Sequence, residues 1–172
     1  MAKKISLREY QESVVAKLQS SLEGGSGAAS KLGVQVGNEL WLIDLQDVSE
    51  VVAVPELCHV PLTHHWYRGI ANVRGTLYSV VDLSLFMGNE PTMLSASCRL
   101  LLVNGKFIAN SALLVNKMLG LRNVEQFQSE SSPEPLPPWQ SGAYRDADGR
   151  SWKVLDMAAL AASPQFLQVA TI

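Results

Sequence analysis

The first thirty residues carry the spacing of an amphipathic helix followed by a linker. Apolar side chains recur at three- and four-residue steps from Leu7 to Leu22, and most charged side chains lie off that stripe. Ser6 and Glu9 have the spacing of a capping box, in which each side chain satisfies a backbone N–H left free at a helix start. Gly24-Gly25 ends the pattern, and residues 24–30 (GGSGAAS) have the composition of a flexible linker. We expect this helix either to pack back onto the following domain, which is the favoured interpretation, or to dock on a partner.

From Lys31 onward the hydrophobic period changes to two, which is typical of strands with one buried face. Leu32 begins an alternation that reaches a tight turn at Gly37-Asn38, so residues 31–43 are predicted to form a hairpin. Asp156 is placed to cap a short alanine-rich helix that ends near Pro164. In the first half of the chain after residue 43, the pattern predicts a strand at 50–54, an irregular or briefly helical stretch at 61–73, and a turn at 74–75 before a strand at 76–83. In the second half it predicts a hairpin at 98–115 that turns at 104–105 and a proline-rich loop at 132–138. A last hairpin turns at 148–149, and its return strand is predicted at 152–155.

Many short strands at hairpin spacing, with few long helices, favour an all-β fold of small barrels or a sandwich. Turn residues between 87 and 97 separate two strand-rich halves, and we expect the domain to divide there into two subdomains. The predicted organisation is therefore a helix and linker over residues 1–30 and a β domain over residues 31–172.

Composition and charge narrow the classes of partner. The 172-residue chain is 47% hydrophobic and only 17% charged, against about 25% charged in a typical soluble domain, which favours apolar surface for partner contacts. The net charge of −2, with scattered Lys and Arg, lacks the basic footprint of a nucleic-acid-binding protein. No secretion signal is apparent, and no uncharged apolar run approaches the roughly 18 residues of a membrane span. We expect a cytoplasmic protein without membrane insertion, in which both cysteines are buried and reduced.

The sequence offers little catalytic chemistry. It contains no phosphate-binding loop, no dinucleotide fingerprint and no nucleophile elbow, and all three histidines lie between positions 59 and 65. Cys58, His59, His64 and His65 are zinc-type donors, but neither the C-x-x-C nor the H-x-x-x-H spacing occurs. We therefore expect no enzyme activity, no metal and no cofactor.

The stretch from Tyr67 to Gly88, YRGIANVRGTLYSVVDLSLFMG, resembles the signature of the CheW-like domain, the coupling module of bacterial chemosensory arrays. The matching positions are Gly69, Asn72, Arg74, Gly75, Asp82 and Leu83, and weaker matches extend the resemblance over residues 31–163. The pattern departs from the family at Ser79, where proline is usual, and at residues 115–118 (VNKM), where the family has Val-Asp-x-Val. The leading helix is most like the family members of twitching-motility systems driven by type IV pili.

The resemblance implies two packed five-stranded SH3-like β-barrels with an N-terminal helix and a short C-terminal helix. It further implies a non-catalytic adaptor or scaffold that binds the regulatory domain of a CheA-type histidine kinase and the cytoplasmic tip of a methyl-accepting chemoreceptor. Such a protein is recruited from the cytoplasm to membrane-associated receptor arrays, here in control of twitching motility.

The same resemblance implies a receptor- and kinase-binding surface. The favoured interpretation of Arg74 is a salt bridge with Glu50 that shapes the receptor groove, since an arginine fork binds a carboxylate with two hydrogen bonds. The alternative is a guanidinium at a turn that is solvated or bonded to nearby carbonyl oxygens. Val48 is expected to be half core and half groove lining. The remaining candidate binding residues are Trp66, Gly69, Asn72 and Gly75.

Several of these residues also have structural interpretations. Trp66, beside the histidine pair, is expected to lie partly exposed at an interface, whereas Trp152 is expected to be buried. Gly75 is interpreted as a turn glycine, while for Gly69 a turn role and space for a receptor helix stay open. Asp82 is expected to be a cap or turn residue.

Two other functional classes stay open. One is a CheW-like module that binds a different regulator. The other is a β-barrel that binds a small ligand, which requires an apolar pocket of ligand size inside a barrel.

Overall fold

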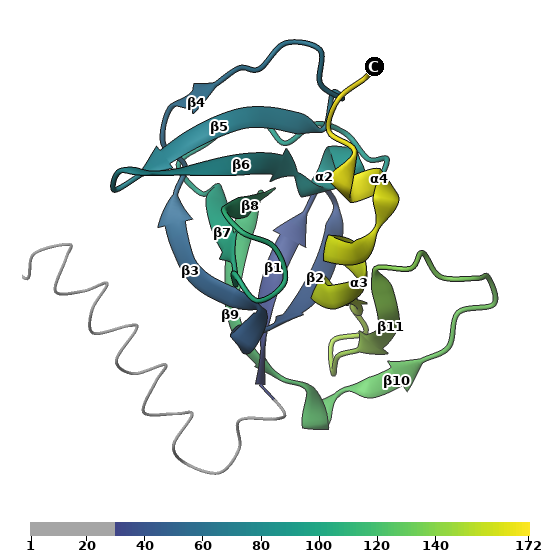
Figure 1. Cartoon of the computed structure of the whole chain (residues 1–172). Coiled ribbons are helices and arrows are strands. Elements are labelled where there is room, and N and C mark those ends of the chain that lie inside the picture. The colour runs from purple at the N-terminus through teal and green to yellow at the C-terminus, as the bar shows by residue number, and fades with distance from the viewer. Residues whose placement is uncertain (1–29) are drawn as a thin grey trace, which may run out of the picture. The chain divides into compact units, whose positions relative to one another are not determined.

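The computed structural model describes residues 30–172, and the helix expected between Ser6 and Gly24 lies outside the described residues. Within the described part, the chain is almost entirely β, with two six-stranded sheets and a few short helices (Figure 1). This confirms the all-β class and the two packed β subdomains. Each sheet has six strands instead of the expected five because a strand of only two or three residues, β4 or β10, adds at one edge.

The first sheet combines the N-terminal hairpin with the C-terminal strands. Its order is β10-β11-β12-β2-β1-β9, and β12 runs parallel to β2 whereas the β1–β2, β10–β11 and β11–β12 pairs are antiparallel. The expected turn at Gly37-Asn38 joins β1 to β2, and Gly37 takes a φ of +60° there. The strand bounds are β1 (Ser30–Val36), β2 (Glu39–Asp44), β9 (Lys117–Asn123), β10 (Gln128–Glu130), β11 (Gln140–Arg145) and β12 (Ser151–Leu155).

The second sheet contains the middle of the chain in the order β3-β7-β8-β6-β5-β4. Strand β6 pairs with β8 in parallel, and its other partner is β5, which is antiparallel to it. The strand bounds are β3 (Val48–Ala53), β4 (Leu57–Cys58), β5 (Tyr67–Val73), β6 (Thr76–Asp82), β7 (Arg99–Val103) and β8 (Ser111–Val115).

The expected division of the chain near residues 87–97 does not separate the two sheets. This segment connects β6 and a short helix to β7, and β6 and β7 belong to the same sheet. The first sheet in turn takes β1 and β2 from before the segment and β9–β12 from after it. The reason is the pair of parallel contacts, β6 with β8 and β12 with β2, which join strands distant in sequence.

Two segments differ from the pattern-based expectation. Residues 67–73 form strand β5, where an irregular stretch was expected. The hydrophobic pattern did not indicate this strand because two of its inward positions, Gly69 and Ala71, weaken the alternation. Conversely, Phe107 and Ile108 lie outside β8, which begins only at Ser111. These two side chains instead pack against the core from the connecting loop.

Short helices connect and cover the sheets. Asp82 accepts a hydrogen bond from the backbone N–H of Leu85, and Asp156 accepts one from Ala159, so both aspartates are N-caps as expected. The helices are η1 (Leu45–Asp47), α2 (Leu83–Phe86), η2 (Val124–Gln126), α3 (Met157–Ala162) and α4 (Pro164–Leu167).

The main core lies between the sheets, and β7 and β8 are buried on both faces. Leu101 and Val103 face the inter-sheet core, whereas Leu100 and Leu102 face a second cluster within the curved β3–β8 sheet. This double burial explains why β7 and β8 read as continuous apolar runs.

Candidate functional site

The β5–β6 turn presents the residues that carry the family resemblance. Val73 pairs with Thr76, so Arg74 and Gly75 form a two-residue loop, and both have positive φ, +50° and +87°. Positive φ at both central residues is the requirement of a type I′ turn, which matches the twist of the flanking strands. The side-chain oxygen of Asn72 accepts a hydrogen bond from the Gly75 backbone N–H at 2.8 Å. The turn thus places the Arg74 side chain at an exposed position.

Arg74 forms the expected ion pair with Glu50 on β3. Nη2 of Arg74 contacts Oε2 of Glu50, and both side chains are substantially exposed. The hydrogen bond from this guanidinium to Glu50, with the charge attraction as a smaller cause, raises the pKa of Arg74 above its ordinary value. The contact therefore pairs two charges at the surface without burying either.

The same ion pair shows how strongly the second sheet is curved. In its strand order, β3 stands at one edge and β5 next to the other, with β7, β8 and β6 between them. Side chains from β3 and the β5–β6 turn can meet only if the sheet curls round on itself, as in an SH3-like barrel. The barrel interior is filled by buried side chains, of which Ala71, Val80, Leu100, Ala112 and Leu114 are fully inaccessible. This part of the chain thus has a packed core where a small-ligand barrel needs a pocket.

The apolar candidate residue beside the ion pair has a mixed environment. Val48, at the start of β3, is half-buried and packs against the inter-sheet core, which agrees with the core half of its expected position. Val51, three residues along the same strand, leaves 37% of its surface exposed. Strand β3 is also an edge of its sheet, so it combines an open edge with apolar and charged side chains.

Gly69 is required by packing within the chain. Its φ is +118°, and a Cβ placed there would lie 2.1 Å from the backbone oxygen of Cys58 on the neighbouring strand β4. The ladder between β5 and β6 also shifts register between Tyr67 and Gly69. Close approach of β4 therefore accounts for this glycine. A Cβ at Gly75, by contrast, meets nothing within 4 Å, so the turn conformation alone accounts for Gly75.

The expectation that Trp66 is exposed is wrong. Its side chain is 4% exposed and belongs to the inter-sheet core. The ring stacks on His64 at 5.3 Å between centroids and meets Phe86 edge-on at 5.2 Å. Phe86 also contacts Phe166 of α4 and Trp139, so the indole is covered by segments that are distant in sequence. Trp152, in contrast, is buried as expected.

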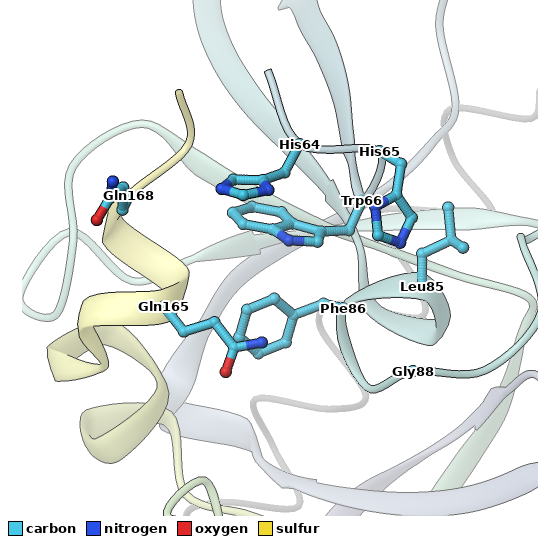
Figure 2. A pocket seen from close by; sticks show the side chains of 8 residues that line it. All are labelled: His64, His65, Trp66, Leu85, Phe86, Gly88, Gln165 and Gln168. Carbon is cyan, nitrogen blue, oxygen red and sulfur yellow. The ribbon is translucent and has the colours of Figure 1, made fainter. Parts of the chain in front are cut away.

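A surface pocket opens beside this aromatic group. Its volume is about 530 Å³, and its lining includes the nearly buried rings of Trp66 and Phe86 (Figure 2). The other lining residues come from the segment before β5, from α2 and the residue pair after it, and from α4 and its C-cap: His64, His65, Leu85, Gly88, Gln165 and Gln168.

A buried polar network ties β5, β6 and the 87–97 segment together. The carboxylate of Asp82 is fully buried and accepts hydrogen bonds from the Arg68 guanidinium at 2.9 Å and from both the backbone N–H and the hydroxyl of Thr92. The sequence indicated the capping role of Asp82. It gave no signal for Thr92, which lies ten residues further along an irregular segment.

The candidate metal donors do not converge. Cys58 is exposed on β4, contrary to the expectation of a buried thiol, while Cys98 is buried as expected. Within residues 30–172, no group of three or more His, Cys, Asp or Glu side chains is arranged to hold a metal ion. No helix of this described part is long and apolar enough to cross a membrane.

Comparison with known proteins identifies the class of protein to which this fold, with its curved sheet and exposed turn, belongs. Residues 31–165 match the model of the CheW-like domain, and the chain belongs to the CheW-like family. It is similar to Protein PilI of Pseudomonas aeruginosa, with 29% identity over 157 residues that cover 88% of this chain and 84% of that protein. The structure is similar to that of scaffolding protein TtCheW from Thermoanaerobacter tengcongensis, with a TM-score of 0.63, 21% identity, and coverage of 74% of this chain and 88% of the other. At 21% identity, this last likeness concerns the fold.

Proposed function

We propose that the chain is a non-catalytic adaptor that couples a methyl-accepting chemoreceptor to a CheA-type histidine kinase, in signalling that controls twitching motility. It acts in the cytoplasm, recruited to receptor arrays at the membrane. Membership of the CheW-like family and the similarity to PilI support this proposal. The adaptor works by holding receptor and kinase in a fixed geometry, so that the signal passes as a coupling free energy between two interfaces.

The observation that carries the receptor half of the proposal is the exposed Glu50–Arg74 pair. The carboxylate of Glu50 on β3 pairs with the guanidinium of Arg74, whose backbone lies in the type I′ turn. A guanidinium has five N–H donors, so Arg74 can stay bound to Glu50 and still donate to a partner. Strand β3 also offers an open edge, and its Val48 and Val51 face the inter-sheet side, opposite to Glu50, because they pair with Val103 and Leu101. Gly75 and Asn72 serve this surface by fixing the turn.

The test is to measure binding of the Arg74→Ala variant to two purified partners, the receptor tip and the kinase regulatory domain. We expect the affinity for the receptor tip to fall about tenfold or more, as for a charged contact at an interface centre, while the affinity for the kinase domain stays unchanged. Isothermal titration calorimetry measures both.

A matched control is Arg145→Ala. Arg145 forms a similar exposed ion pair with Glu130 but lies in the other sheet, so we expect this variant to bind both partners as the wild type does. Loss of both partners in Arg74→Ala would show that Arg74 is structural. If the wild-type chain binds neither partner, it serves another regulator and the coupling proposal is wrong.

A further inference from the structure

Two exposed apolar side chains lie next to each other in the segment between α2 and β7. Met93 is 79% exposed and Leu94 is 53% exposed. They form the only adjacent pair among the exposed large hydrophobic side chains of residues 30–172. Single exposed apolar side chains are ordinary on a protein surface, whereas contiguous ones mark interaction sites. This pair is therefore a candidate contact with a partner.

The irregular segment that carries the pair is held on both sides of it. Thr92, directly before the pair, donates two hydrogen bonds to the carboxylate of Asp82, and its carbonyl oxygen accepts one from Arg68 at 3.3 Å. After the pair, the Sγ of Cys98 donates to the backbone oxygen of Met93 at 3.4 Å. The pair thus projects from a loop that is ordered before any partner arrives, which lowers the entropy cost of binding.

Two cations without an acidic partner flank the same loop. The guanidinium of Arg99, the first residue of β7, donates to two backbone oxygens of the loop at 2.7 and 2.8 Å. The hydroxyl of Ser97 donates to the carbonyl oxygen of Asn116 at 3.3 Å, which brings the loop next to the exposed Lys117. In the part of the chain that the structure describes, neither cation pairs with a carboxylate, including that of Glu90 in the same segment. The chemistry complements a partner surface on which carboxylates flank an apolar side chain.

The loop and the Arg74 turn lie at opposite ends of β6. Thr92 is held at Asp82, the last residue of this strand, whereas the turn at Arg74 and Gly75 directly precedes Thr76, the first residue. The six steps between the two ends of the strand span about 20 Å at 3.3 Å per residue. A protein bound at the loop therefore leaves the turn open to a second partner.

We propose that residues 93–99, together with Lys117, bind the regulatory domain of the kinase. An apolar side chain of that domain packs on Met93 and Leu94, and carboxylates beside it meet the two cations. The inference rests on the proposed function, because an adaptor whose Glu50–Arg74 pair serves the receptor needs a separate surface for the kinase. The flexible thioether of Met93 lets the contact adapt to the shape of its partner.

Titration calorimetry of the full chain with the purified kinase regulatory domain, and separately with the receptor tip, tests this assignment. The double variant Met93→Ser with Leu94→Ser should lose about tenfold or more in affinity for the kinase domain, as for a central apolar contact, and should keep its affinity for the receptor tip. The control Leu167→Ser replaces a leucine on α4 that is 54% exposed, and it should bind both partners as the wild type does. All substituted side chains are exposed, and circular dichroism verifies that each variant is folded.

A charge-reversed variant tests the electrostatic part of the contact. Lys117→Glu should weaken kinase binding several-fold at low salt, and the difference from the wild type should shrink as salt is added, because salt screens exposed charges. Lys106→Glu is the matched control, since Lys106 is also exposed, forms no ion pair with the described residues and lies in the loop at the other end of β7. It should bind the kinase domain as the wild type does.

The outcomes separate this inference from the proposed function. If the wild type binds both partners and the double variant binds the kinase domain equally well, the inference is overturned while the adaptor role stands. A double variant that loses the receptor tip and keeps the kinase domain also overturns it, and assigns the loop to the receptor. A wild-type chain that binds neither partner contradicts the adaptor role and this inference together.

Discussion

At the scale of single residues, two glycines of the family signature have different physical causes. Gly69 combines a φ of +118° with contact against the backbone of β4, whereas Gly75 needs only its φ of +87°. The sequence placed both at the signature but could not separate these causes, because the strand that approaches Gly69 comes from residues 57–58. The burial of Trp66 was missed for the same reason, since Phe86 and Phe166 cover this region from distant segments.

The two glycines should therefore differ in their tolerance of alanine. We expect Gly75→Ala to lower the free energy of unfolding by about 1 kcal/mol, the cost of a left-handed residue with a Cβ. Gly69→Ala should cost more, about 2–3 kcal/mol, because backbone strain is joined by a clash with a carbonyl that cannot move freely. Urea denaturation of both variants measures the difference. Equal losses would contradict the assignment of Gly69 to close strand packing.

Asp146 gives the fold a defined acid sensitivity. A hydrogen bond from the Trp152 indole is the largest influence that lowers its pKa, with further lowering from Arg150, and together these bring it from 3.8 to about 2. Because the folded-state pKa is the lower one, ionised Asp146 stabilises the fold fully above pH 3.8, and this contribution is lost as pH falls toward 2.

The variant Asp146→Asn tests this sensitivity. We expect it to be less stable than the wild type near neutral pH, and we expect the difference to shrink as pH falls from 3.8 to about 2. Thermal unfolding followed at several pH values measures the difference. A gap that is independent of pH would show that the charge of Asp146 does not matter.

At the scale of secondary-structure elements, local chemistry was predictable and long-range pairing was not. The turns at Gly37-Asn38, Arg74-Gly75 and Asp148-Gly149 and the cap at Asp156 all follow from neighbouring residues, and the structure contains each of them. Strand β5 escaped prediction because two of its inward positions are Gly and Ala. The parallel pairings of β6 with β8 and of β12 with β2 depend on the whole fold, so the sequence suggested a division of the domain that the sheets do not follow.

The Asp82–Thr92 contact shows how an irregular segment is held to the sheet. Thr92 is 2% exposed, and its hydroxyl donates to Asp82 at 2.8 Å. We expect Thr92→Val to lower the free energy of unfolding by about 1.5–3 kcal/mol, the range for hydrogen bonds to charged groups. Thr76→Val on the exposed start of β6 is the matched control and should be almost neutral. Urea denaturation compares the two, and similar small effects would show that solvent replaces the threonine hydroxyl.

At the scale of the whole molecule, the interleaved sheets make one body from two β subdomains. The first sheet takes strands from both ends of the described chain, and the second takes the middle. The inter-sheet core and the aromatic group at Trp66 and Phe86 bind these parts together. Such a body suits an adaptor, because two partners bound to a rigid protein are held at a fixed distance and angle. The Glu50–Arg74 surface then belongs to one sheet, which leaves the other available to a second partner.

An adaptor that couples receptor to kinase must bind both at the same time through one copy of the chain. The most direct measurement is analytical ultracentrifugation of the full chain with the receptor tip and the kinase regulatory domain, alone and together. We expect a ternary complex that sediments faster than either binary complex, and we expect Arg74→Ala to leave only the complex with the kinase domain. If the two partners compete for the chain, so that only binary complexes form, the coupling role is contradicted.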